Sequence, residues 1–159
     1  MLKIKLITTG NLKEAYWRDA VAEYSKRLGA YARLEIVELK ESRLPESPSE
    51  GEIAAALEKE ATAIFAALPA RATLVALCVE GKQYTSEELA TLLDGVMQES
   101  GTLALVIGSS HGLAPRVKAA ADLKLSVSKL TFPHQMMRVL LLETLYRSLS
   151  ILNGGKYHK

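Results

Sequence analysis

The stretch TLVALCV at residues 73–79, together with TLALVI at residues 102–107, decides the fold of this 159-residue chain. Both runs are almost entirely apolar, and neither alternates in the way that a strand with one face in water does. Continuous apolar runs of this length are typical of strands that are covered on both faces of a parallel sheet. We therefore predict that these two strands form the centre of the sheet.

Strands and helices alternate outward from this centre. LKIKLITT at residues 2–9 alternates like a strand, and apolar residues from Trp17 to Leu28 then recur at helical spacing. Thr85 and Glu88 form a T-x-x-E capping box that opens another helix. Further strands are predicted at residues 33–39 and 123–128, and helices at residues 53–67, 85–98 and 135–152, with a short one at Pro115. The pattern predicts one α/β domain over residues 1–159, with an open, mostly parallel sheet and helices on both faces.

The composition excludes several classes of protein. The chain is 48% hydrophobic and 24% charged, which are ordinary globular values. The first residues lack the apolar run of a signal peptide, and charged residues interrupt the longest apolar segment at residues 136–152, so we expect no membrane span. A single cysteine, Cys78, suits a reducing cytoplasm, and its apolar neighbours indicate a small core residue. No metal-ligand spacing is present, so no metal is expected.

Positive charge is concentrated at the C-terminal end. Residues 1–115 hold 12 Lys and Arg against 16 Asp and Glu, net −4, whereas residues 116–159 hold 8 against 2, net +6. A basic end of this kind is expected for a protein that binds a polyanion, although a solvated surface would give the same count.

Three loops follow the predicted strands 73–79, 102–107 and 123–128. In open α/β sheets, ligands bind beyond the carboxyl ends of the strands, where such loops converge. Gly81, Gly108 and Gly112 lie in two of the loops and would let a ligand approach the backbone closely. Neither GxGxxG nor GxxxxGK[ST] occurs, which disfavours a dinucleotide fold and a P-loop kinase.

The last predicted helix is apolar around most of its circumference. One domain of this size rarely buries a helix on all sides, so we favour a homodimer contact over packing within the chain. Glu143 and Arg147, four residues apart, are interpreted as a structural pair.

LTFPHQMMRVLLLETLYRSLSI at residues 130–151, the terminal YHK, IGSSHGL at residues 107–113 and TLVALCVEGK at residues 73–82 resemble the SPOUT-class RNA methyltransferases. Within that class the chain is similar to the RlmH family, the ribosomal large subunit pseudouridine methyltransferases, over its whole length. The resemblance implies an α/β knot, in which the C-terminal segment threads a loop to form a trefoil, and a homodimer. It also implies S-adenosylmethionine as cofactor and methylation of N3 of a pseudouridine in 23S rRNA of the assembled ribosome.

The resemblance also assigns cofactor contacts. The family usually has a second glycine where this chain has Ser109, so the hydroxymethyl group is expected to narrow the pocket or to add a hydrogen bond. The expected cofactor contacts are Leu77, Gly108, Val127, Ser128, Lys129, Leu130, Thr131 and Phe132.

Four residues are candidates for the catalytic chemistry. The N3 proton of the substrate needs a base, for which His134 and His158 are candidates, or a cation that stabilises the deprotonated imide. Tyr157 could stack on an exposed RNA base, and the tail that carries it is expected to be ordered by RNA or by the partner subunit. Arg138 is expected to face either a phosphate or the other subunit.

Two alternative functions stay open at the level of the sequence. One is a non-catalytic RNA-binding or ribosome-associated protein that lost cofactor binding through Ser109. The other is a methyltransferase of the same class that acts on transfer RNA.

Overall fold

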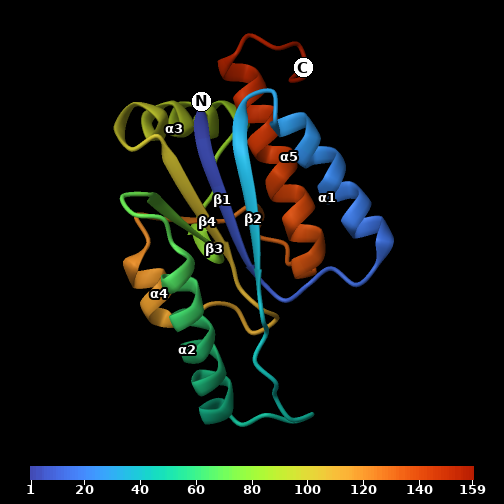
Figure 1. Ribbon diagram of the computed structural model, residues 1–159, viewed down its shortest axis with the longest axis vertical. Helices are drawn as coiled ribbons and strands as arrows, with labels where there is room; N and C mark the ends of the chain where they lie inside the picture. Colours follow the sequence, from blue (N-terminus) through green and yellow to red (C-terminus); the bar gives the residue numbers. More distant parts are fainter.

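A five-stranded sheet, parallel throughout, forms the centre of the molecule in the computed structural model, which describes residues 1–159 (Figure 1). The strand order is β2-β1-β4-β3-β5, so β4 lies between β1 and β3 in the middle. The strands are β1 (Leu2–Thr9), β2 (Ala32–Leu39), β3 (Thr73–Lys82), β4 (Thr102–Ile107) and β5 (Leu123–Leu125). The predicted α/β sheet is confirmed, and the strands predicted for its centre, at residues 73–79 and 102–107, pair with each other.

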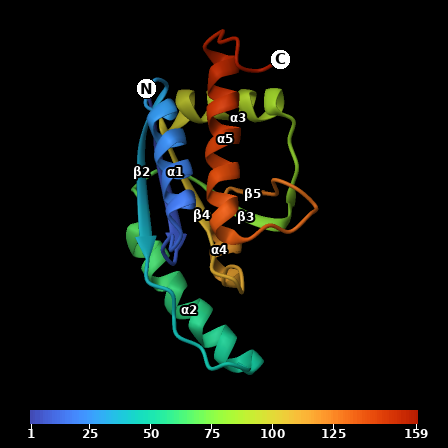
Figure 2. The ribbon, with the colours of Figure 1, turned by 90° about the vertical axis from the view of Figure 1, so that its right-hand side faces the viewer.

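Helices cover both faces of this sheet, as the sequence predicts. Helices α1, α3 and α5 lie on one face, and α2 and α4 lie on the other (Figures 1 and 2). The helices are α1 (Ala15–Leu28), α2 (Glu50–Ala67), α3 (Ser86–Glu99), α4 (Pro115–Ala120) and α5 (His134–Leu152). None of them is long and apolar enough to cross a membrane.

Strand β4 connects two hydrophobic cores. Leu103 and Leu105 point into the core beneath α1, α3 and α5, whereas Ala104 and Val106 point into the core beneath α2 and α4. Alternate side chains of a strand point to opposite faces, so a strand with helices on both sides must be apolar at every position. This requirement explains why the run at residues 102–107 is continuous.

Two helices begin with complete capping boxes. The Thr85 hydroxyl accepts a hydrogen bond from the Glu88 N–H, and the Glu88 carboxylate accepts one from the Thr85 N–H, as predicted. Ser49 and Glu52 make the same pair of bonds at the start of α2. The sequence S-P-S-E-G-E at residues 47–52 contains the S-x-x-E pattern of this second box.

The fifth strand is shorter than predicted. The prediction extended it to residue 128, but β5 ends at Leu125. The Ser126 N–H still donates to the Lys82 carbonyl, whereas the Ser126 hydroxyl donates to the Ser128 carbonyl and the Ser128 hydroxyl accepts from the Leu130 N–H. Serine side chains that bond to nearby backbone compete with a strand ladder, and here they turn the chain out of the sheet. Threading of this segment into a trefoil knot stays a prediction.

Candidate functional site

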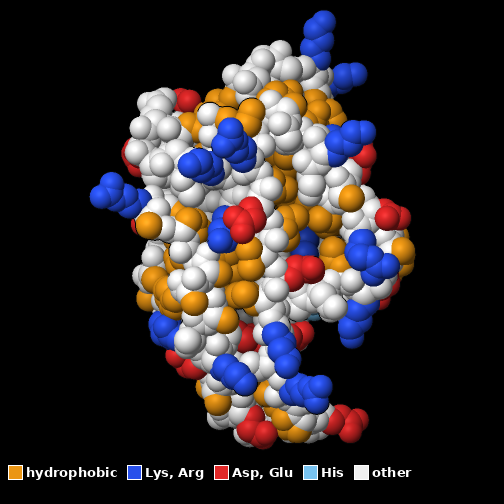
Figure 3. All heavy atoms as spheres, viewed as in Figure 1, with side chains coloured by type: hydrophobic (Ala, Val, Ile, Leu, Met, Phe, Trp, Pro, Cys, Tyr) orange, Lys and Arg blue, Asp and Glu red, His pale blue; other side chains and the backbone are white.

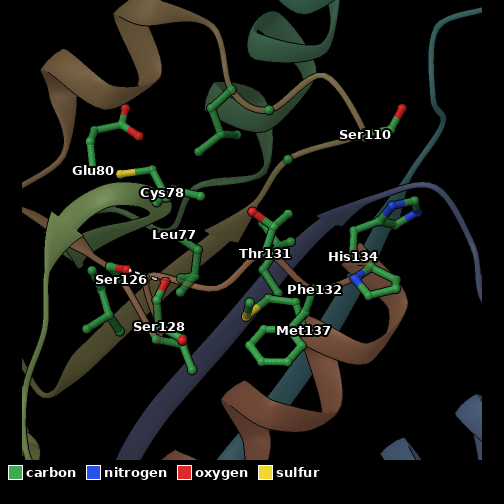
Figure 4. Close-up of a pocket in the computed structure, with 18 of the residues that line it drawn as sticks. Leu77, Cys78, Glu80, Ser110, Ser126, Ser128, Thr131, Phe132, His134 and Met137 are labelled. Atoms are coloured by element: carbon green, nitrogen blue, oxygen red, sulfur yellow. Dashed lines mark hydrogen bonds between the residues drawn. The ribbon is translucent and has the colours of Figure 1, made fainter.

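A cavity of about 360 Å³ opens at the carboxyl ends of β3, β4 and β5. Its walls come from the loops after these strands and from the start of α5 (Figure 4). Seven of the eight predicted cofactor contacts line it: Leu77, Gly108, Val127, Ser128, Leu130, Thr131 and Phe132. Lys129, the eighth, is exposed and is not part of the lining. The three loops that the sequence analysis selected therefore line one cavity.

Apolar side chains form one wall of the cavity and part of its mouth. Figure 4 shows Phe132 and Met137 side by side beneath Thr131, facing Leu77 across the cavity. Val79 and Leu130 line the same cavity although they are 59% and 71% exposed, and they are two of only four large hydrophobic residues exposed in the chain. Exposed apolar groups that border a cavity are typical of a surface that a ligand covers.

The polar wall carries an ion pair. Lys118 Nζ lies 2.6 Å from Glu80 Oε1, and this hydrogen bond is the main reason that the pKa of Glu80 lies below its ordinary value. Cys78 also lines the cavity and is partly exposed, so its predicted place in the core is wrong. Burial, with Glu80 nearby, raises the pKa of its thiol, which makes Cys78 a poor nucleophile.

The glycines of these loops are required by the packing of the backbone itself. A Cβ at Gly81 would lie 2.6 Å from the Leu125 backbone, and one at Gly108 would lie 2.2 Å from the Gly112 carbonyl oxygen. Gly112 has φ +87°, a left-handed conformation that side chains disfavour. Gly81 and Gly108 therefore have no room for a side chain, because the chain's own backbone occupies the space that a Cβ would take. That a ligand approaches the backbone at these glycines stays a prediction.

Comparison with known proteins identifies the family. The family model described as "Predicted SPOUT methyltransferase" matches residues 2–158. Proteins named ribosomal RNA large subunit methyltransferase H from Streptococcus thermophilus (strain CNRZ 1066) and Bifidobacterium adolescentis are 43% and 47% identical to this chain. Each match covers 99% of this chain and all of the relative. The chain is a SPOUT methyltransferase of the RlmH family.

A solved structure supports the fold of this RlmH-family chain. A probable methylase family protein from Haemophilus influenzae Rd KW20 superposes with a TM-score of 0.52 and covers 99% of this chain and 70% of its own. At 19% identity this likeness concerns the fold alone.

Ser109, the departure from the RlmH pattern, does not direct its hydroxyl group into the cavity. The Ser109 hydroxyl donates a 3.0 Å hydrogen bond to Glu60 Oε1 on α2, and Ser109 is 8% exposed. Of the two predicted effects, the added hydrogen bond is therefore the one observed, although its partner is a protein side chain. The sequence could not reveal that partner, which lies 49 residues away.

Arg138 is almost completely buried. The residue is 1% exposed, with Nη1 donating to Glu38 Oε2 and Nη2 donating to the Gly10 carbonyl, both at 2.7 Å. The predicted phosphate contact of Arg138 is therefore wrong for this chain, whereas its predicted contact with a second subunit stays a prediction. Arg138 fixes α5 to β2 and to the end of β1, while its Nε has no partner.

The C-terminal tail docks at the far end of α5. Tyr157 donates a 2.9 Å hydrogen bond to Glu143 Oε2, its ring packs under the Arg147 guanidinium at 4.5 Å, and His158 Nε2 lies 2.8 Å from Glu87 Oε1. Burial and the Glu143 carboxylate raise the pKa of the neighbouring Tyr24 to about 12. The predicted pairing of Glu143 with Arg147 is confirmed at 2.6 Å.

Only one of the predicted catalytic residues lies at the cavity. His134, the first residue of α5, lines it (Figure 4), whereas Tyr157 and His158 follow the other end of this helix (Figure 2). A 19-residue helix is about 28 Å long at about 1.5 Å per residue. Within one subunit Tyr157 and His158 are bonded to Glu143 and Glu87, and neither of them lines the cavity.

The basic C-terminal end is partly neutralised by ion pairs. Of the eight Lys and Arg residues in 116–159, four are paired with Glu residues: Arg116, Lys118, Arg138 and Arg147. The other four, Lys124, Lys129, Lys156 and Lys159, are exposed. On the face drawn in Figure 3, Lys and Arg are intermixed with Asp and Glu and form no continuous patch.

Replacing Arg138 distinguishes a structural from a catalytic role. Arg138→Met removes two charge-assisted hydrogen bonds, and we expect it to lower the free energy of unfolding by about 2 kcal/mol in urea denaturation. Arg138→Lys, which keeps the charge but can make only one of the bonds well, should fall between Met and wild type. Lost methylation with unchanged stability would contradict this interpretation and restore the catalytic one.

Proposed function

We propose that this protein uses S-adenosylmethionine to methylate N3 of a pseudouridine in 23S rRNA of the large ribosomal subunit. The observation that carries the proposal is the single cavity formed by the residues that the RlmH resemblance assigns to the cofactor. The full-length relatives, which are named ribosomal RNA large subunit methyltransferase H, support the substrate class. A ribosomal substrate would be met in the cytoplasm.

The residues that line the cavity fit S-adenosylmethionine. Its volume of about 360 Å³ is within the range of small-molecule sites, roughly 300 to 1,000 Å³. Leu77, Phe132 and Met137 offer apolar surface suited to an adenine ring, while the loops at Gly108 and Ser128 offer backbone polar groups. When bound, the cofactor supplies a methyl group that its sulfonium already activates. The protein then has to align the substrate nitrogen with that carbon and dispose of the N3 proton.

His134 is the residue best placed to accept that proton. It lines the cavity at the start of α5, and an imidazole can accept a proton near neutral pH. Lys129 is exposed in the segment between β5 and α5, five residues before His134. It is a candidate for a cation that stabilises the deprotonated imide. Because His134 lines the cavity and Lys129 does not, the positions of the two residues support a general base at His134 over a stabilising cation at Lys129.

A homodimer would bring the C-terminal tail of one subunit close to the cavity of the other. Apolar side chains on α5 are only partly buried and lie outside the apolar clusters of the chain, namely Met136, Val139, Leu140 and Ile151. Met136 and Leu140 are one helical turn apart and therefore share a face, which a second subunit could cover. In an antiparallel pair of α5 helices, Tyr157 and His158 of one subunit would approach the cavity of the other. We propose that each site is completed in this way.

Methylation of defined RNA substrates tests the function. Ribosomes and free large subunits from a strain lacking the gene, incubated with the protein and labelled S-adenosylmethionine, should incorporate label into 23S rRNA. Mass spectrometry should locate the methyl group on a pseudouridine. Label in bulk transfer RNA would instead favour the transfer RNA methyltransferase. RNA binding with no label, and no heat of cofactor binding in calorimetry, would favour the non-catalytic protein.

His134 and His111 form a matched pair for testing the base. His134→Ala should lower kcat by about 100-fold or more, the usual contribution of a general base, with little change in cofactor affinity. His111→Ala should leave both unchanged, because His111 is exposed in the loop beyond the cavity and does not line it. Equal activity of the two variants would exclude His134 as the base.

Mixed dimers test whether the tail acts across subunits. A chain truncated after Gly155 and a His134→Ala chain should each be nearly inactive as homodimers. After subunit exchange, about a quarter of wild-type activity should return, because half of the dimers are mixed and one of their two sites is intact. If the tail served its own subunit, no mixed dimer would contain an intact site and no activity would return.

A further inference from the structure

Glu60 is a buried carboxylate that the proposed reaction does not use. It lies on α2, outside the cavity lining, and is 6% exposed. Oε1 accepts the hydrogen bond from the Ser109 hydroxyl, and Oε2 accepts one from the Ser42 N–H, each at 3.0 Å. None of the ion pairs in the molecule includes Glu60, so the Ser109 hydroxyl and the Ser42 N–H are the polar partners of its carboxylate. Buried carboxylates need such partners, and both oxygens are satisfied by segments that are distant in sequence.

The first of these segments is the turn that forms one wall of the cavity. Gly108, Ser109, Ser110 and Gly112 all line the cavity, and the Gly112 N–H donates to the Ser109 carbonyl at 2.9 Å. Gly108 packs against the Gly112 backbone so closely that no Cβ would fit between them. The turn is therefore tight within itself, and the bond from Ser109 to Glu60 is its side-chain connection to α2.

The second segment is the connection between β2 and α2, residues 40–49. Besides the bond from its N–H to Glu60, Ser42 donates its hydroxyl to the Ala56 carbonyl at 3.4 Å. A hollow of about 630 Å³ lies between this connection and α2, with Glu60 among its lining residues. Apolar packing here is therefore limited, and polar contacts to α2 hold the connection in place.

We propose that Glu60 is a positioning residue for the methyl-donor site, acting through Ser109 on the Gly108–Gly112 turn. This inference rests on the proposed function, because it takes S-adenosylmethionine as the occupant of the cavity. The carboxylate holds the Ser109 hydroxyl toward α2 and keeps the backbone of the turn at the distance that the cavity requires. Without it, the hydroxyl group loses its acceptor, and the turn loses its hydrogen bond to α2.

Calorimetric titration with S-adenosylmethionine tests the inference. Glu60→Ala and Ser109→Ala should each raise the Kd about tenfold, as expected for loss of a charge-assisted hydrogen bond that positions a binding loop. The double variant should bind no more weakly than Glu60→Ala alone, because both substitutions remove the same bond. Glu60→Gln should stay within about twofold of wild type, since an amide can accept from the Ser42 N–H and donate to the Ser109 oxygen.

A control on the same helix separates positioning from general destabilisation. Ser49→Ala removes the N-terminal cap of α2 without touching the cavity, so it should lower the Tm while leaving the Kd unchanged. If Glu60→Ala fails to fold, Ser109→Ala carries the test, because it deletes a single oxygen atom.

The outcomes separate this inference from the proposed function. Wild-type affinity in Ser109→Ala, or additive losses in the double variant, would overturn the positioning role while leaving the methyl-donor site intact. Failure of the wild-type protein itself to bind S-adenosylmethionine would overturn the proposed function, and this inference with it.

Discussion

The parallel direction of all five strands is the constraint on which the rest of the structure depends. It places the loops after β3, β4 and β5 at one edge of the sheet, where they enclose the cavity. It also requires a helix between successive strands, which covers β4 on both faces and forces its continuous apolar sequence. The core and the ligand site are thus two results of the same strand arrangement, because the residues that leave the core at the ends of the strands become the walls of the site.

Local patterns were enough to predict most of this architecture. Apolar runs, helical periodicity and the Thr85–Glu88 box depend on neighbouring residues, so the sequence reveals them directly. The end of β5 was missed because the alternation of the sequence continues past Leu125, whereas the side-chain bonds of Ser126 and Ser128 to nearby backbone compete with the strand ladder there. The interpretation of Cys78 failed because β3 emerges from the core before its apolar sequence ends.

The polar contacts between residues far apart in the chain could not be predicted from the sequence. The family resemblance selected seven residues that line the cavity. It could not show that Ser109 bonds to Glu60 or that Arg138 donates its hydrogen bonds to Glu38 and the Gly10 carbonyl. Each of these pairs joins residues on different elements, and neither partner carries a local signal of the other. A charged residue near a predicted site can therefore be structural, and ion pairs reduce the apparent basic end of this chain to four exposed lysines.

Helix α5 separates His134 from the C-terminal tail of the same subunit. His134 is its first residue, and the tail folds back onto Glu143 and Arg147 directly after its last turn. The number of residues in the helix consequently sets the distance between its two ends. Inserting or deleting one residue would shift the tail by about 1.5 Å and rotate it by about 100° around the helix axis. Evolution of this segment is therefore expected to proceed by substitution, while changes of length accumulate in surface connections such as residues 40–49.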